Sequence, residues 1–440
     1  MERNFLMSDR SSVFPRTDAA DWWQVIRKEL KGRPEETLFT EWWEGFQTPP
    51  FHSAEYPRPK DALFGPYSWH ASCSVGPNDL PGSALEILNT GADGLRIRFR
   101  PDTDLTEALK GIQLEFLRIE LRPEELSGNW IAHWKSLIER QDQKDLNTAL
   151  GFDLWAGLSS DESGGRSFQK SLDELRILEA AQLFRHPVLI DCSPYEESGA
   201  RMDTQLGLAL SMAHEVLEED STISPDQLHF RFSISRNFLL ETAKLRAFRE
   251  LWSFYLDTVN RARTEPFINA RNSRRPLSAS DHHGNLLRLT TMATSGVLGG
   301  AQNIELTNHH LGRSEKGEAH LPVNILHLLR FEGRLDRLED PLAGSHSVEA
   351  LTEQLSETGW SAFQEIQNRG GASRAVCDPW FSQRIAQEAE AEQNAHDQGA
   401  YPVIGSSLHP FGSDSMKTEP NAHSWPLRRL AESAEKNLGR

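Results

Sequence analysis

Side chains able to carry out acid–base or nucleophilic chemistry are concentrated in the segment DCSPYEESGA, residues 191–200. The segment follows HPVLI, a short apolar run that predicts a buried strand. Catalytic residues of α/β proteins gather at the carboxyl ends of strands. The candidates for such a role here are Asp191, Tyr195, Glu196 and Glu197. Pro194 stands among them without a proton donor, an acceptor or a metal ligand in its side chain, and its presence needs an explanation.

Signatures of metal and nucleotide binding are missing from the sequence. The segments SDHHGN (280–285) and TNHHLG (307–312) contain adjacent histidines, but neither has the i, i+4 spacing that places two ligands on one helix face. Walker loops, G-x-S-x-G and G-x-G-x-x-G patterns are also absent. Cys73, Cys192 and Cys377 are too few for a four-cysteine zinc site, and their odd number fits a reducing compartment. We therefore expect no metal site and a cytoplasmic location.

The charge of the chain restricts its partners. The 440 residues include 47 Lys and Arg against 64 Asp and Glu, which gives a net charge of -17. Such a chain repels nucleic acid and acidic membrane surfaces, so neither is an expected partner. The sequence contains no run of apolar residues long enough to span a membrane and no charged-then-apolar leader.

The pattern of strands and helices predicts an α/β fold. Eight strand-like runs cover residues 69–75, 94–99, 116–121, 146–154, 187–192, 228–235, 267–272 and 301–308. Stretches with helical spacing lie between them, for example the one carrying Leu206, Leu210, Ala213 and Leu217. This alternation predicts a closed (β/α)8 TIM barrel, with a doubly wound open sheet as the structural alternative. Several runs are half polar, as where Arg96 and Arg98 alternate with apolar residues, so an inner face lining a wet channel is one interpretation.

The chain divides into three parts by sequence pattern. For residues 1–60 the pattern predicts a helical and extended N-terminal arm. Its paired tryptophans, such as Trp22 and Trp23, could pack on the chain's own body or on another subunit. Residues 61–410 predict the barrel domain, whose last part consists of long helices after residue 333. Residues 411–440 predict a polar C-terminal tail.

Four segments, read in order, resemble the barrel domain of the methylmalonyl-CoA mutase family. They are NFLLETAKLRAFRELW (237–252), NLLRLTTMATSGVLGGAQNIELTN (285–308), EDPLAGSHSVEALTEQL (339–355) and GWSAFQEIQNRGG (359–371). The resemblance covers roughly residues 60 to 410 and implies a barrel that threads a CoA thioester along its axis. It also implies adenosylcobalamin across the C-terminal face, where homolysis of the cobalt–carbon bond starts a radical shift that interconverts methylmalonyl-CoA and succinyl-CoA.

Positions that face the substrate in active members of this family differ here. The family motif YHMQEAGA corresponds to SPYEESGA, so Pro194 stands at the histidine that helps to place the migrating thioester. The motif RPWTIRQYAG is matched by GPYSWHASCS (65–74), which puts Gly65 at an arginine and Ser72 at the tyrosine. The motif GHTQSLHTN becomes GGAQNIELTN, with Gly300 and Glu305 at histidines. The retained pocket candidates are Asn237 and Gln302. Because each active-site donor typically contributes a few kcal/mol, these losses together imply little or no turnover.

The resemblance further implies that this chain acts with another one. Complete mutases carry a flavodoxin-like domain whose D-x-H-x-x-G loop ligates cobalt, whereas DHHG (281–284) has its glycine too early and lies inside the barrel region. About 70 residues follow NRGG, too few for a barrel end and a cobalamin-binding domain. We therefore expect a non-catalytic small (beta) subunit that binds no cofactor alone and stabilises a homologous large (alpha) subunit carrying adenosylcobalamin.

Two other functions remain open at this stage. The chain could be an active acyl-CoA mutase barrel that works with a separate cobalamin-binding subunit. It could instead be a binding protein or a barrel enzyme with a new activity built on the polar residues of 191–200. In that case the carboxylates should line an open pocket, whereas pairing with arginines would close the site.

Overall fold

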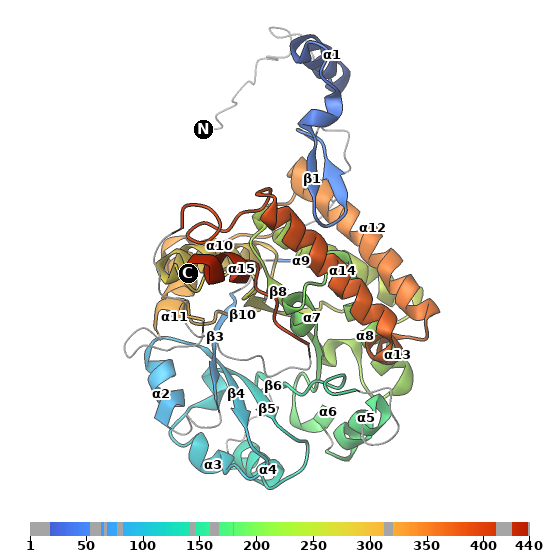
Figure 1. The fold of residues 1–440 in the computed structure, drawn as a ribbon. Helices are drawn as coiled ribbons and strands as arrows, with labels where there is room; N and C mark the ends of the chain where they lie inside the picture. Colours follow the sequence, from blue (N-terminus) through green and yellow to red (C-terminus); the bar gives the residue numbers. More distant parts are fainter. Residues whose placement is uncertain are drawn as a thin grey trace, which may run out of the picture.

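The computed structural model describes residues 18–52, 63–65, 68–76, 82–140, 146–158, 167–178, 180–311, 320–410 and 425–438 of the chain. Within these ranges, eight strands form one sheet in the order β6-β5-β4-β3-β10-β9-β8-β7 (Figure 1). The strands are β3 (His70–Val75), β4 (Gly94–Phe99), β5 (Arg118–Pro123), β6 (Thr148–Leu150), β7 (Val188–Asp191), β8 (Leu228–Ile234), β9 (Phe267–Asn272) and β10 (Asn303–Glu305). All neighbouring pairs of these strands are parallel.

The sheet is a nearly closed barrel. Isolated bridges between Ala149 and His186 and between Asp153 and Leu189 bring β6 beside β7, the two ends of the strand order. The predicted (β/α)8 barrel is therefore confirmed, and the doubly wound open sheet is wrong. Each of the eight predicted runs overlaps one barrel strand, with β5 lying two residues later than its run. Strands β6 and β10 are shorter than their runs because the chain turns soon after residues 150 and 305.

Helices surround the barrel and extend beyond it. Those interspersed with the strands are α2 (Gly82–Asn89), α3 (Leu105–Ala108), α4 (Trp130–Arg140), α5 (Phe168–Ile177), α6 (Ala180–Leu183), α7 (Ser193–Glu197), α8 (Met202–Glu219), α9 (Phe238–Thr258), α10 (His282–Leu298) and α11 (His320–His327). The later ones are α12 (His346–Asn368), α13 (Ala372–Cys377), α14 (Pro379–Asp397) and α15 (Glu432–Leu438). Shorter turns are the 3-10 segments Glu35–Leu38, Leu114–Phe116, Pro225–Gln227 and Leu335–Arg337 and the π turn Leu328–Glu332. In the described part of the chain, no helix is both long and apolar enough to cross a membrane.

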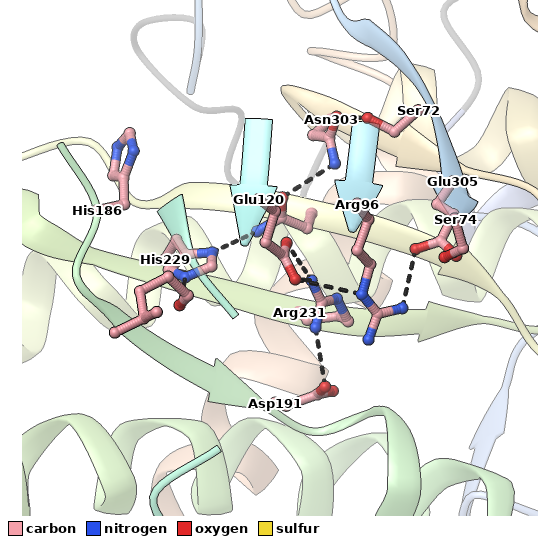
Figure 2. Close-up of polar contacts among 12 residues, drawn as sticks. Ser72, Ser74, Arg96, Glu120, His186, Asp191, His229, Arg231, Asn303 and Glu305 are labelled. Atoms are coloured by element: carbon pink, nitrogen blue, oxygen red, sulfur yellow. Dashed lines mark hydrogen bonds and ion pairs between the residues drawn. The ribbon is translucent and has the colours of Figure 1, made fainter. Parts of the chain in front are cut away.

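Apolar and polar residues alternate in several strands because each strand has one face toward the surrounding helices and one toward the lumen. In β4, Leu95, Ile97 and Phe99 are fully buried among the residues of the hydrophobic core, whereas Arg96 turns into the lumen (Figure 2). Successive side chains of a strand point to opposite faces, so an apolar outer face and a polar inner face produce alternation. The inner face of β4 is thus polar, but buried and paired charged side chains, rather than a wet channel, occupy the lumen at the level of Arg96.

Close helix packing supports the C-terminal half of the barrel. Helix α12 lies along α8 and α9. A Cβ atom on Gly207 of α8 would lie 2.6 Å from the backbone nitrogen of Phe363, and one on Gly359 of α12 would lie 2.9 Å from the Cβ atom of Leu206. Glycine at both positions therefore lets α8 and α12 approach closely enough to hold the segment between β7 and β8 in place.

The N-terminal arm consists of a helix and a hairpin. Helix α1 (Ala19–Leu30) begins with a capping box, in which Asp18 and Asp21 each bind the backbone nitrogen of the other. The antiparallel strands β1 (Thr40–Trp42) and β2 (Phe46–Thr48) form the hairpin. No residue of α1 is buried, and Figure 1 shows this helix projecting away from the barrel.

Candidate functional site

Charged side chains from five strands meet inside the barrel. They are Arg96 of β4, Glu120 of β5, Asp191 of β7, Arg231 of β8 and Glu305 of β10, and together they form what we call the central ion network. None of them is more than 7 % exposed. Figure 2 shows these side chains pointing toward one another from the surrounding strands.

Arginines connect the carboxylates of this network across the lumen. Arg231 donates from Nη1 to Asp191 Oδ2 at 3.0 Å and from Nη2 to Glu120. Arg96 Nε lies 3.2 Å from Glu120 Oε1, and its Nη1 donates to Glu305 Oε2 at 3.1 Å. Strands β5 and β8 are separated by β4, β3, β10 and β9 in one direction and by β6 and β7 across the closure of the barrel, so the pair of Arg231 and Glu120 spans the lumen. The chain's own side chains therefore occupy the barrel axis at this level.

The network stays charged at neutral pH. Burial alone would raise the pKa of Glu120, but Arg231 and Arg96 outweigh it and lower this pKa to about 2. The pKa of Glu305 is likewise lowered to about 2, since Arg96 and other arginines outweigh the effect of burial. Burial is also outweighed at Asp191, whose pKa is lowered chiefly by Arg231. The three carboxylates of the network are thus ionised at neutral pH, and none of them is poised to exchange a proton near pH 7.

Arg118 and neutral polar groups occupy the lumen on the amino-terminal side of this network. Arg118 donates from Nη1 to Asn147 Oδ1 at 2.6 Å, lies 3.3 Å from His186 Nδ1 and stacks on the ring of Phe267 at 3.9 Å. Burial and the charge of Arg118 lower the pKa of His186 to about 2. Burial lowers the pKa of His229 to about 3, so both imidazoles are neutral.

The segment of residues 191–200 contains the end of β7 and the short helix α7. Asp191 Oδ1 accepts hydrogen bonds from Ser193, from the backbone nitrogen at 3.0 Å and from Oγ at 2.5 Å. Pro194 lies in the first turn of α7, where a missing N–H costs no helical hydrogen bond, and its carbonyl accepts from Ser198 N at 3.1 Å. The proline therefore has a role in the local helix that requires no chemistry.

The other polar residues of this segment do not line an open pocket. Glu197 is 1 % exposed and receives two hydrogen bonds from Arg274, at 2.7 and 2.6 Å. Tyr195 is buried beneath Trp425, with ring centroids 5.0 Å apart. Glu196 is 4 % exposed, and burial raises its pKa to about 7. A shifted pKa is present, as expected of a functional carboxyl, but the pairing of Asp191 and Glu197 with arginines closes the site.

The paired histidines lie near each other without forming a metal site. The ring of His282 stacks on that of His310 at 4.5 Å, and His310 contacts His309 at 4.0 Å between centroids. Among the residues described by the structure, no group of three or more His, Cys, Asp or Glu side chains is arranged to hold a metal ion.

Comparison with known proteins identifies the family. The family model described as "Methylmalonyl-CoA mutase" matches residues 174–437, which is more than half of the chain. The chain belongs to the methylmalonyl-CoA mutase family. The strands β7 to β10, helix α7 and most of the segments quoted for the resemblance lie inside the matched region.

Relatives described as methylmalonyl-CoA mutase small subunits resemble this member of the family over most of its length. The one from Propionibacterium freudenreichii subsp. shermanii is 29 % identical over 369 residues, covering 76 % of this chain and 55 % of the relative. The one from Porphyromonas gingivalis is 26 % identical, covering 83 % and 65 %, respectively. The one from Streptomyces virginiae is 26 % identical, covering 91 % and 72 %. The chain therefore spans between about half and three quarters of the length of these relatives.

The positions singled out from the mutase motifs are spread over both ends of the barrel. Two of them join the lumen, where Ser72 Oγ donates to Asn303 Oδ1 at 2.5 Å and Glu305 belongs to the central ion network. Pro194 and Asn237, which is the N-cap of α9, follow the carboxyl ends of β7 and β8.

The remaining three positions lie before the strands. Gly65 is exposed ahead of β3. Gly300 has a φ of +84°, and a Cβ atom there would lie 2.9 Å from the ring of Phe64. The Gln302 side chain bonds backbone atoms, accepting from Ile268 N at 2.8 Å and donating to Pro266 O at 3.1 Å. The structure thus does not gather the seven positions into one pocket.

Sequence reasoning missed the two residues that hold the network together. Arg231 and Glu120 lie within apolar runs, LHFRFSIS and FLRIEL, where a charged residue signals an inward position of a barrel strand. That signal marks each residue separately, but it does not reveal which charge on a distant strand is the partner.

Proposed function

We propose that the chain is the small (beta) subunit of an adenosylcobalamin-dependent methylmalonyl-CoA mutase and performs no catalysis itself. The central ion network is the observation that carries this proposal. A CoA thioester threaded along the axis, as in active members of the family, would have to separate Arg231 from Glu120, both of which are buried. Leaving a buried charge without its partner costs about 3–5 kcal/mol, so the network strongly disfavours such a ligand.

The substitutions at the substrate-facing positions support the same proposal. Pro194 offers no hydrogen-bond donor where the family places a histidine, and it is built into the first turn of α7. Glu305 carries a negative charge that Arg96 neutralises within the lumen. Both positions have roles in holding the barrel together rather than in binding an acyl group.

The residues at the C-terminal face do not fit adenosylcobalamin. The resemblance puts this cofactor across the carboxyl ends of the strands, where it would supply the radical that starts the rearrangement. In this chain Trp425 lies over Tyr195 at that face, and Arg428 N donates to Glu197 O at 2.9 Å. We therefore propose that the cofactor of the holoenzyme is held by the partner subunit, and no reaction step is assigned to this chain.

The N-terminal arm supplies a surface for that partner, the homologous large (alpha) subunit. Its hairpin is fixed to the barrel body, because Tyr401 donates to Glu41 O at 2.8 Å and Glu44 accepts from Met202 N at 3.0 Å. Helix α1 extends from this anchor with Val25 53 % exposed and no buried residue. A preformed helix with an unburied apolar face is suited to bind in a groove of another chain.

Two measurements on purified proteins test the proposal. Isothermal titration of methylmalonyl-CoA into the chain alone should give no binding heat, whereas the large subunit from the same source should bind. Adding the chain to the large subunit should raise the unfolding temperature of the large subunit, because a ligand of the native state stabilises it. Saturable binding of the acyl-CoA to the chain alone would contradict the non-catalytic role.

The alternative of an active barrel served by a separate cobalamin-binding subunit predicts the opposite result. Such a barrel must bind the acyl-CoA without the large subunit and must convert it when the cobalamin-binding subunit is added. No contact in the described part of the chain favours this alternative over the first proposal.

A further inference from the structure

The C-terminal segment of residues 425–438, which we call the C-terminal cap, lies on the carboxyl-terminal face of the barrel. Active sites of (β/α)8 enzymes occupy this face, and they are built from the loops that follow the strands. The cap contacts α7 after β7 and the loop of residues 273–281 after β9. Helix α15 lies near the end of the chain (Figure 1), and its Glu435 accepts a hydrogen bond from Ala279 N in that loop.

The first part of the cap covers α7, the helix that contains Pro194. The ring of Trp425 lies 5.0 Å from that of Tyr195 and 6.2 Å from that of Phe381, measured between centroids. Ser198 Oγ donates to Pro426 O at 2.8 Å, and Arg428 N donates to Glu197 O at 2.9 Å. Side-chain and backbone contacts therefore hold the cap against the end of β7.

The middle of the cap is bound to Arg275 in the loop after β9. Arg275 Nη1 donates to Arg428 O at 2.9 Å, and Leu430 N donates back to Arg275 O at 3.0 Å. Leu430 and Ala431 form a small buried apolar cluster with Val403, and none of the three is more than 2 % exposed. The cap is thus anchored by hydrogen bonds and by apolar burial at the same point.

The last part of the cap is anchored by an ion pair. Arg429 Nη2 donates to Glu435 Oε2 at 2.5 Å and to Leu277 O at 3.2 Å. Glu435 Oε1 accepts from Ala279 N at 2.7 Å and from Ser278 Oγ at 3.2 Å. Arg429 and Glu435 are 8 % and 6 % exposed, so this pair is buried between α15 and the loop after β9.

We propose that the C-terminal cap is a permanent intramolecular plug that closes the catalytic face of the barrel against a cofactor carried by any other chain. The place where a bound cofactor would meet the barrel is filled by this chain's own residues, and the occupant is fixed at both α7 and the loop after β9. Only the identity of the excluded cofactor, adenosylcobalamin, rests on the proposed function. A partner subunit must then bind at another surface, and the arm remains accessible for that purpose.

Hydrogen exchange measured by mass spectrometry tests the plug in the isolated chain. Peptides covering 193–200, 273–281 and 425–435 should be protected, as expected for amides that exchange only through opening of structure.

Arg429→Met should speed exchange in all three peptides by about tenfold or more, because it removes the buried ion pair. Arg428→Met is the matched control, since the Arg428 side chain is exposed and only its backbone atoms contact the barrel. The barrel-wall peptide 118–123 should be unchanged in both variants, which separates local opening from global unfolding.

A second variant keeps the test decisive if Arg429→Met does not fold. Trp425→Ala removes the ring over Tyr195 and should speed exchange in peptide 193–200 while leaving 118–123 unchanged. Equal exchange in Arg429→Met and Arg428→Met, or an unprotected cap in the unmodified chain, would overturn the plug.

Hydrogen exchange in the complex with the adenosylcobalamin-loaded large subunit tests whether the C-terminal cap stays in place when the partner binds. The cap peptide 425–435 should keep its protection on binding, whereas peptides from 19–51 should gain protection. Faster exchange of the cap on binding would show a displaceable gate and would overturn the proposal. If the large subunit does not bind at all, the proposed function fails, but the result from the isolated chain still decides whether the plug exists.

Discussion

At the scale of single residues, the barrel lumen is held by charges that compensate one another. Arg231 connects Asp191 and Glu120, and Arg96 connects Glu120 and Glu305. Each carboxylate is taken out of water, so its arginine partners must replace the hydration that it loses on folding. This arrangement stabilises the closed lumen only as long as every member is present.

Removing one carboxylate should therefore destabilise the barrel. Glu120→Gln leaves Arg231 and Arg96 with less compensation and should lower the free energy of unfolding by about 3–5 kcal/mol, measured by urea denaturation. Glu124→Gln is the control, because Glu124 pairs with Arg98 at 3.5 Å with both side chains more than a third exposed, and its effect should stay below about 1 kcal/mol. Similar losses in the two variants would show that the network does not support the barrel.

The carboxyl group of Glu196 should make the stability of the chain depend on pH. Burial raises its pKa, whereas arginines lower the pKa of Glu120 in the central ion network. Burial raises the pKa of Glu196 from its ordinary value of 4.5 to about 7, so folding favours the protonated form. The stabilisation from this group is complete below pH 4.5 and is lost as the pH rises toward 7. Glu196→Gln should remove this loss and raise the free energy of unfolding at pH 8, by up to roughly 3 kcal/mol, with little change at pH 4.5.

The neighbouring residue provides the comparison for that experiment. Glu197→Gln breaks the paired hydrogen bonds from Arg274 and should destabilise the chain at pH 8. Denaturant unfolding of both variants at pH 4.5, 6 and 8 gives the result. A Glu196→Gln variant that is less stable than the unmodified chain at pH 8 would show that the carboxylate form is the one that folding favours.

At the scale of elements, the sequence predicted the strands well and the role of their polar residues less well. All eight barrel strands were expected, because apolar outer residues such as Ile97 alternate with inner ones such as Arg96. The ion pairs were not predictable, since each partner of Arg231 lies on a strand far away in sequence. A helix followed by an extended stretch was expected in the arm. The helix is present as α1, and the extended stretch contains a hairpin whose turn needs Gly45, with a φ of +89°.

The C-terminal part differed most from its expectation at this scale. A polar tail was predicted, and residues 425–438 instead dock on the barrel through α15 and buried groups such as Arg429. The polar composition of this stretch hides the docking, because its anchors are backbone hydrogen bonds and an ion pair rather than a run of apolar residues. The predicted domain boundaries at residues 60 and 410 fall in or next to parts outside the described residues and stay predictions.

The arm leads to a prediction about assembly. Val25→Asp places a charge on the exposed apolar face of α1 and should weaken binding to the large subunit by about tenfold or more, measured by biolayer interferometry. Gln24→Asp, at an exposed position beside it, should change the affinity much less. The barrel should unfold at the same temperature in both variants, because α1 contributes no buried residue. Unchanged affinity in Val25→Asp would exclude this face of the arm from the interface.

At the scale of the whole molecule, three features separate the surface for a partner from the surface that catalysis would need. The barrel axis is crossed by the central ion network, and its carboxyl-terminal face is covered by residues 425–438. Helix α1 of the N-terminal arm projects away from the barrel (Figure 1). In the function that we propose, a barrel of the mutase family arranged in this way supports another subunit and takes no substrate along its axis.

Mutase turnover tests this account most directly. It should be measured with methylmalonyl-CoA and adenosylcobalamin for the chain alone, for the large subunit alone and for the two purified together. We predict no turnover by the chain alone, and one stable complex whose activity is lost when the large subunit is inactivated. Turnover by this chain with only a small cobalamin-binding partner would contradict the account, because it would require a substrate to pass through the barrel that its own side chains fill.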